Sequence, residues 1–142
     1  MTRDEFIRRA VGLPWVDRAC NWRAMDCWGV VVMYFRYVYG EELPCVEGYS
    51  TGERTIIDGF HGQIQNGKWR EVTTPSGDCI AFMLFKNGIA THVGVVVDEQ
   101  YVLHAAGDAQ TEGQVRCDQL DLFRRFHRGE MRFYRYEGCR CW

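Results

Sequence analysis

A cysteine and two histidines have the types and the spacing of a thiol-based catalytic site. Cys27 follows Asp26 at the start of an apolar stretch, where the Asp26 side chain could cap a helix. A helix N-terminus favours a thiolate, because its unpaired N–H groups and its dipole stabilise negative charge. His92 and His104 lie on separate apolar runs far downstream. The order of cysteine, histidine and a second polar residue is typical of a nucleophile, its base and the group that orients the base.

The spacing of the two histidines predicts that their rings meet. They are twelve residues apart, with a hairpin turn signal between them. Partners on neighbouring antiparallel strands lie within about 5 Å of each other. His92 would then act as the base for Cys27, and His104 would fix the tautomer and the orientation of His92. We expect the backbone N–H of Cys27 to stabilise the oxyanion that forms on attack.

The nucleophile would begin a buried helix. The apolar run from Cys27 to Tyr39 stops at Gly40 and contains three consecutive valines, which alone would favour a strand. A run of about thirteen apolar residues is long for a strand but ordinary for a buried helix, so we predict a helix. Residues 15–26 lack clear periodicity and are predicted to form a loop.

The other predicted elements give helices followed by a meander of strands. Thr2 and Glu5 form a capping box for a helix that ends near Gly12. This order predicts an α+β arrangement in a single domain over residues 1–142, with 137–142 as a loose tail. The remaining predicted helices cover residues 51–64 and 120–126, and the predicted strands cover Cys79–Phe85, His92–Val97, Tyr101–Ala105 and Met131–Tyr136.

The composition argues against several classes of protein. A chain of 142 residues with 46% hydrophobic and 25% charged residues is typical of one folded globular domain. The formal net charge of −2 gives no electrostatic reason to expect a nucleic-acid partner. The charged start Met1–Glu5 predicts no secretory signal, and no segment approaches the roughly 18 apolar residues of a membrane span. We therefore expect a protein made in the cytoplasm with mostly reduced thiols.

Four segments, taken together, resemble the NlpC/P60 cysteine peptidases. The resemblance covers residues 12–105 and implies a papain-like core, with the nucleophile helix packed on an antiparallel sheet. It also implies hydrolysis of an amide bond in peptidoglycan stem peptides next to D-glutamate, with no cofactor and no metal. Cys27 would be the nucleophile, His92 the base and His104 the third polar residue. The similar segments are Asp26–Gly29, Gly77–Phe82, Thr91–Val96 and Val102–Ala105.

Other positions depart from the pattern of the family. Trp15 occupies the place of a tyrosine whose hydroxyl lies near the oxyanion, and Trp28 follows the nucleophile where serine is usual. The segment Val16–Trp22 replaces a Trp-Gly-Gly segment. Trp15, Asp26 and Trp28 are therefore candidates for the oxyanion region or the substrate groove. Large aromatic side chains are more often packing residues, and Asp26 is first of all a helix cap.

The segment Gly12–Trp15, together with Asp26–Gly29, resembles the tail-associated members found in phages and phage-like particles. Other tail or baseplate proteins would then be partners, and the particle would deliver the enzyme to the host cell wall. Two alternatives stay open. One is a structural or assembly component of the tail tip with latent or no hydrolysis. The other is a thiol-dependent amidase or acyltransferase that acts on an amide outside peptidoglycan.

The remaining cysteines do not form a recognisable framework. Seven cysteines without paired spacings argue against a set of disulfides. Cys139 and Cys141 form a C-x-C pair, with Cys117 and His127 upstream as conceivable zinc ligands. Structural zinc sites usually have two C-x₂₋₄-C pairs, so we predict no metal. His61 and His127 are predicted to be surface residues, and the predicted structural thiols are Cys20, Cys45, Cys79 and Cys117.

Overall fold

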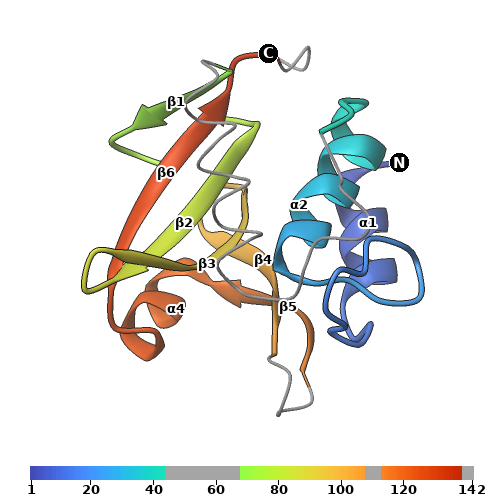
Figure 1. Ribbon diagram of the computed structural model, residues 1–142. Coiled ribbons are helices and arrows are strands. Elements are labelled where there is room, and N and C mark those ends of the chain that lie inside the picture. Colours follow the sequence, from blue (N-terminus) through green and yellow to red (C-terminus); the bar gives the residue numbers. More distant parts are fainter. Residues whose placement is uncertain (44–67, 108–112, 139–142) are drawn as a thin grey trace.

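The structure is a computed structural model that describes residues 1–43, 68–107 and 113–138. Its helices are α1 (Arg3–Ala10), α2 (Cys27–Tyr34), the π-helix η1 (Phe35–Tyr39) and α4 (Leu120–Phe126). Its strands are β1 (Trp69–Val72), β2 (Ile80–Lys86), β3 (Ile89–Val97), β4 (Tyr101–Ala106), β5 (Gln114–Gln119) and β6 (Glu130–Tyr136). Within these residues the strands form one antiparallel sheet in the order β1-β6-β2-β3-β4-β5 (Figure 1).

The two N-terminal helices begin at the predicted caps. The Thr2 hydroxyl accepts a hydrogen bond from the Glu5 N–H at 3.2 Å and opens α1. The Asp26 carboxylate accepts from the Gly29 N–H and opens α2. All residues of α2 after Cys27 are buried, so the core favours the helix over the β propensity of its valines. The predicted helix over 27–39 is confirmed, with its last part wound as the π-helix η1.

The sheet is covered by helices on both faces. The α1 and α2 helices lie on one side, and α4 lies on the other (Figure 1). Strand β2 is buried on both faces, with Ala81 and Met83 facing α2, and Phe82 and Leu84 facing α4. A strand buried on both faces has a continuous apolar sequence, which explains why β2 lacks a polar alternation. This arrangement confirms the predicted α+β class.

The predicted central strands and the predicted helix at 120–126 are present. Strands β1 and β5 were not predicted, since each lies at an edge of the sheet and has only one fully buried residue. The predicted helix over 51–64 lies outside the described residues, and so do residues 139–142 of the predicted tail. No helix in the described part of the chain is both long and apolar enough to span a membrane.

Some of the cysteines carry a free thiol, and at least one forms a disulfide. Cys79 is fully buried and disulfide-bonded, so the prediction of a structural thiol is wrong for this residue. Cys27 and Cys117 carry free thiols. Cys45, Cys139 and Cys141 lie outside the described residues. Across the ranges that the structure describes, no three His, Cys, Asp or Glu side chains are grouped to hold a metal ion.

Candidate active site

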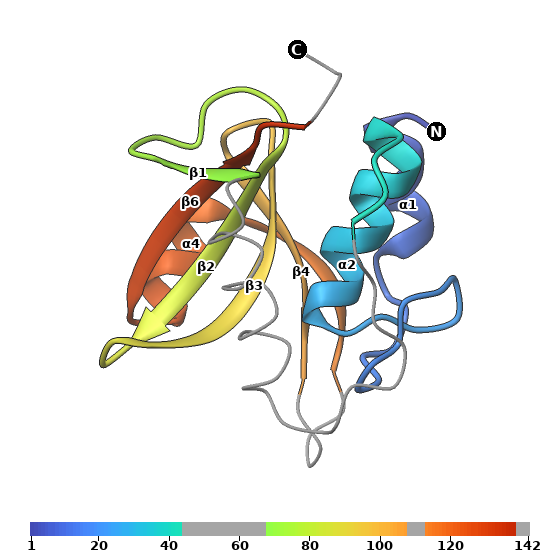
Figure 2. The ribbon, with the colours of Figure 1, turned by 45° about the horizontal axis from the view of Figure 1, so that its top comes forward.

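Strands β3 and β4 separate where the candidate site lies. They pair only between Val95–Val97 and Tyr101–Leu103. Beyond that point β3 stays paired with β2, and β4 stays paired with β5 as far as Ala106. Figure 2 shows the two strands moving apart beside the first turn of α2. We call this separation of β3 and β4 the fork. His92 and Val93 lie within it, on the part of β3 that no longer pairs with β4.

Cys27 is the first residue of α2 and faces this fork. Burial raises the pKa of its thiol to about 12, and the neighbouring Asp26 carboxylate adds to the rise. Hydrogen bonding to the backbone at Val93 and at the helix start lowers the pKa, but by less than burial raises it. The resting thiol is therefore protonated. The Cys27 sulfur lies against the backbone of Val93, the residue that follows His92. Within the described residues, no hydrogen bond joins this sulfur to the His92 ring.

The two histidines meet as the spacing predicted. His92 Nε2 lies 3.0 Å from His104 Nδ1, and the rings are edge to face with centroids 5.1 Å apart. His104 is only 1% exposed. Burial lowers the pKa of both rings, and the charges of His104 and His127 lower that of His92 further. Both imidazoles are therefore neutral at pH 7, which suits a base that must accept a proton.

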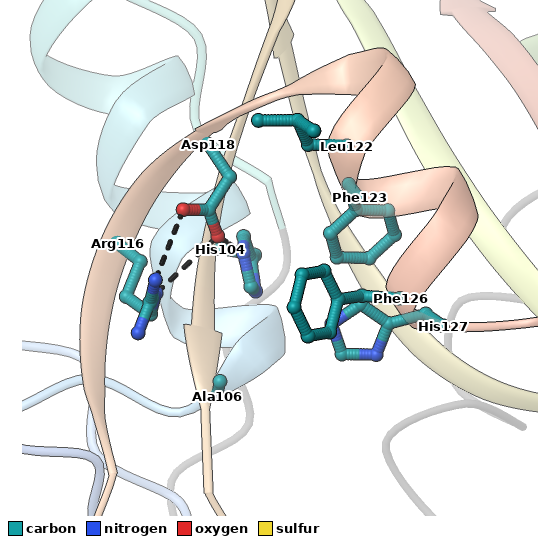
Figure 3. A pocket seen from close by; sticks show the side chains of 8 residues that line it. All are labelled: His104, Ala106, Arg116, Asp118, Leu122, Phe123, Phe126 and His127. Carbon is teal, nitrogen blue, oxygen red and sulfur yellow. Dashed lines mark hydrogen bonds and ion pairs between the residues drawn. The ribbon is translucent and has the colours of Figure 1, made fainter.

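Strand β5 supplies a polar partner of His104 that the sequence did not predict. Asp118 Oδ2 lies 2.8 Å from His104 Nε2, on the side of the ring opposite His92. Arg116 binds the same carboxylate through Nε at 3.3 Å and Nη2 at 3.2 Å (Figure 3). Burial raises the Asp118 pKa, but the hydrogen bonds from His104 and Arg116 outweigh it, so the pKa lies below its usual range. Asp118 is therefore an ionised acceptor.

A cavity of about 380 Å³ opens beside the His104–Asp118 contact. Helix α4 and the residue after it form its apolar wall, and strands β4 and β5 form its polar wall (Figure 3). His127 stacks on Phe123, with the ring centroids 4.2 Å apart, and is only partly exposed. His127 is thus part of a ring cluster that includes His92, and the prediction of a simple surface residue was incomplete.

The model of the NlpC/P60 family matches residues 14–123. The chain belongs to the NlpC/P60 family. Its fold is similar to the crystal structure of the NlpC/p60 domain of the peptidoglycan hydrolase SagA, with a TM-score of 0.53 over 86% of each chain. The sequence identity to that domain is 16%. A search of the curated proteins found no match.

The NlpC/P60 match includes the three further candidate positions, which the structure places differently. Trp28 is 4% exposed and packs in the main core, so it does not reach an open surface. Trp15 is partly buried, and its ring packs beneath Gly107, just after β4. Its backbone N–H donates to the Gly113 carbonyl at 2.8 Å, just before β5. Trp15 therefore lies where β4 ends and β5 begins.

Asp26 uses both carboxylate oxygens to order the backbone on either side of Cys27. Oδ1 accepts from the Gly29 N–H at 2.6 Å, and Oδ2 accepts from the Arg18 N–H at 2.9 Å. The first bond caps α2, and the second fixes the preceding loop to the helix start. The predicted cap is confirmed, and it ties residues on both sides of Cys27 together.

The buried carboxyl of Asp26 is expected to make the stability of this NlpC/P60 protein depend on pH. Burial raises its pKa from 3.8 to about 6, although the Gly29 and Arg18 N–H groups lower it in part. Stability gained from the protonated form is complete below the unfolded pKa and is lost as the pH rises through about 6. Between about pH 3.5 and 7 the free energy of unfolding of the wild type should fall by about 3 kcal/mol relative to that of Asp26→Asn.

Urea denaturation of both proteins at the two pH values measures this difference. Asp121→Asn, at an exposed position of α4, is the matched control and should follow the wild type at both pH values. Parallel pH dependence of the wild type and Asp26→Asn would contradict the prediction.

Proposed function

We propose that this NlpC/P60 protein is a cysteine peptidase that hydrolyses an amide bond in peptidoglycan stem peptides. The observation that carries the proposal is the placement of Cys27 at the start of α2, against the β3 backbone beside His92. His92 is in turn hydrogen-bonded to the buried His104. This arrangement would supply a nucleophile, a neutral base and a group that orients the base.

In the proposed reaction the Cys27 sulfur attacks the carbonyl carbon of the scissile amide. His92 takes the thiol proton and then gives it to the leaving amine nitrogen, so that the C–N bond breaks and an acyl-enzyme forms. Water, deprotonated by His92, then hydrolyses the thioester and restores the thiol. Because thiol and imidazole are both neutral at rest, the proton moves only when substrate is in place.

The start of α2 would stabilise the oxyanion of this reaction. The first N–H groups of a helix have no partner within the helix, and Cys27 provides the first of them. Attack by the sulfur of the same residue brings the developing negative charge close to this N–H group. Trp15, at the end of β4, is our candidate for one wall of the substrate groove.

Peptidoglycan is the proposed substrate because the fold neighbour SagA is described as a peptidoglycan hydrolase. We propose in addition that a phage or phage-like tail carries this enzyme to the host cell wall, alongside other tail proteins. The support for delivery by a tail is the resemblance of Gly12–Trp15 and Asp26–Gly29 to tail-associated members of the family. Mass spectrometry of purified particles tests it, and particles that lack the protein would rule it out.

Incubation with purified muropeptides, followed by mass spectrometry, tests the reaction. The wild type should release peptide fragments whose masses correspond to addition of water, and Cys27→Ala should lower the rate at least about 10⁴-fold. Cys117→Ala removes a second free thiol and should keep wild-type activity. Equal release by the wild type and Cys27→Ala would contradict the proposal. A product that carries a transferred acyl group would instead identify an acyltransferase.

A further inference from the structure

We propose that Asp118 is a positioning residue that fixes which ring nitrogens of His104 and His92 carry hydrogen, and so keeps His92 Nδ1 free to act as the base. The inference rests on the proposed function, because it assigns His92 as the base for Cys27. It depends on an unbroken line of polar contacts across three strands. His92 on β3 contacts His104 on β4, which contacts Asp118 on β5.

The direction of the hydrogen bonds is set at the Asp118 end. An ionised carboxylate can only accept hydrogen bonds. The 2.8 Å contact therefore requires that His104 Nε2 carries its hydrogen and donates it to Asp118 Oδ2. The bonds from Arg116 to both oxygens keep this carboxylate ionised and oriented.

The position of the hydrogen on His104 in turn determines the position of the hydrogen on His92. A neutral imidazole has one N–H donor and one acceptor nitrogen. Since His104 Nε2 is the donor, its Nδ1 must accept, and the 3.0 Å contact then requires an N–H on His92 Nε2. His92 Nδ1 is left without hydrogen. Asp118 thus determines the protonation pattern of a ring that it does not touch.

Without Asp118, the two histidines would not favour one protonation pattern over the other. A neutral His92–His104 pair can hold its shared hydrogen on either ring, and the two arrangements are alternatives of comparable energy. In the second arrangement His92 carries its hydrogen on Nδ1 and cannot accept a proton there. His104 is buried, and Asp118 is the hydrogen-bond partner that satisfies its Nε2. The carboxylate on β5 therefore selects the arrangement that is competent for catalysis.

The protonation pattern can be measured without catalysis. Nitrogen-15 correlation spectra of the ring nitrogens, recorded in the Cys27→Ala background, report which nitrogen carries hydrogen. We expect N–H groups at Nε2 of both His92 and His104. Adding Asp118→Leu, which is of similar shape but accepts no hydrogen bond, should produce Nδ1–H forms on both rings. Unchanged ring spectra in a folded Asp118→Leu protein would overturn the proposal.

Kinetics give a second readout. Asp118→Leu should lower kcat about 10²-fold with little change in KM, since fewer molecules hold the competent protonation pattern. Asp118→Asn keeps an acceptor oxygen without the charge, so an intermediate loss is expected, and it serves if the leucine variant does not fold. The exposed Asp121→Leu is the matched control and should keep wild-type kcat. Unchanged kcat in both Asp118 variants would overturn the positioning role.

The two readouts separate the inference from the proposed function. If the wild type cleaves no muropeptide, the proposed function fails, while the ring spectra still test the role of Asp118. If the wild type cleaves and the Asp118 variants behave like the wild type in both readouts, only the inference fails.

Discussion

Replacement of His92 by alanine is expected to lower kcat/KM about 10³-fold. The thiol of Cys27 has a pKa of about 12, so without a base only about one molecule in 10⁵ holds a thiolate at pH 7. The residual rate should rise about tenfold for each pH unit between about pH 7 and 9, because the thiolate fraction rises in that proportion. The wild type should lack this steep rise, since in the proposed reaction His92 removes the proton during attack. Muropeptide cleavage across this pH range measures both effects.

His127→Gln is the matched control for this prediction. Its ring centroid lies 6.3 Å from that of His92, and it hydrogen-bonds neither catalytic candidate within the described residues. It should keep most of the wild-type activity and the wild-type pH profile. Equal losses in the two variants would show that the ring cluster as a whole matters, and not a base at His92.

Replacement of Gly29 by alanine is expected to destabilise the protein by about 2–3 kcal/mol. A Cβ at this position would overlap the carbonyl oxygen of Ala19, a backbone atom that cannot rotate away, and would lie 3.0 Å from Asp26 Oδ1. Helix propensity alone predicts the opposite sign, a gain of about 1 kcal/mol for alanine over glycine. The sign of the change in urea denaturation therefore separates close packing from helix propensity.

The same substitution should lower activity about 10²-fold in the molecules that remain folded, because a shift of about 1 Å in a reacting group has that effect. The Asp26 N–H donates to the Ala19 carbonyl, so this hydrogen bond holds the loop before α2 against the start of the helix, next to Gly29. Relief of the overlap between the new Cβ and Ala19 would therefore move Cys27. Gly88→Ala, in the β2–β3 turn, is the control for activity: its Cβ would meet no atom within 4 Å, and it should keep full activity although its positive φ costs some stability. Wild-type stability and activity in Gly29→Ala would contradict the close approach.

The parts of the site that depend on local sequence could be predicted. Asp26 before a long apolar run is enough to place the start of α2, because capping and helix length are properties of neighbouring residues. The contact between His92 and His104 was predicted from a single hairpin, although both residues lie where β3 and β4 no longer pair. These interpretations needed no knowledge of distant contacts.

Asp118 could not be predicted, because its role depends on the register between β4 and β5. The pairing of Val102 with Asp118 and of His104 with Arg116 brings the carboxylate beside the buried ring. Strand β5 has only one fully buried residue, Val115, so its sequence lacks the apolar alternation that indicates a strand. The position of β6 between β1 and β2 also could not be predicted from the sequence, since strand order depends on contacts between distant parts of the chain.

Strand β6 lies between β1 and β2, although residues 130–136 are made last among the strands. On the ribosome, β1 has no described neighbour in the sheet until β6 emerges, and β2 has an open edge on that side. Cys27, His92 and His104 are thus synthesised before β6, the strand that joins β1 to the rest of the sheet. The sheet that carries His92 and His104 is therefore complete only after residue 136 has been synthesised, long after α2 and Cys27.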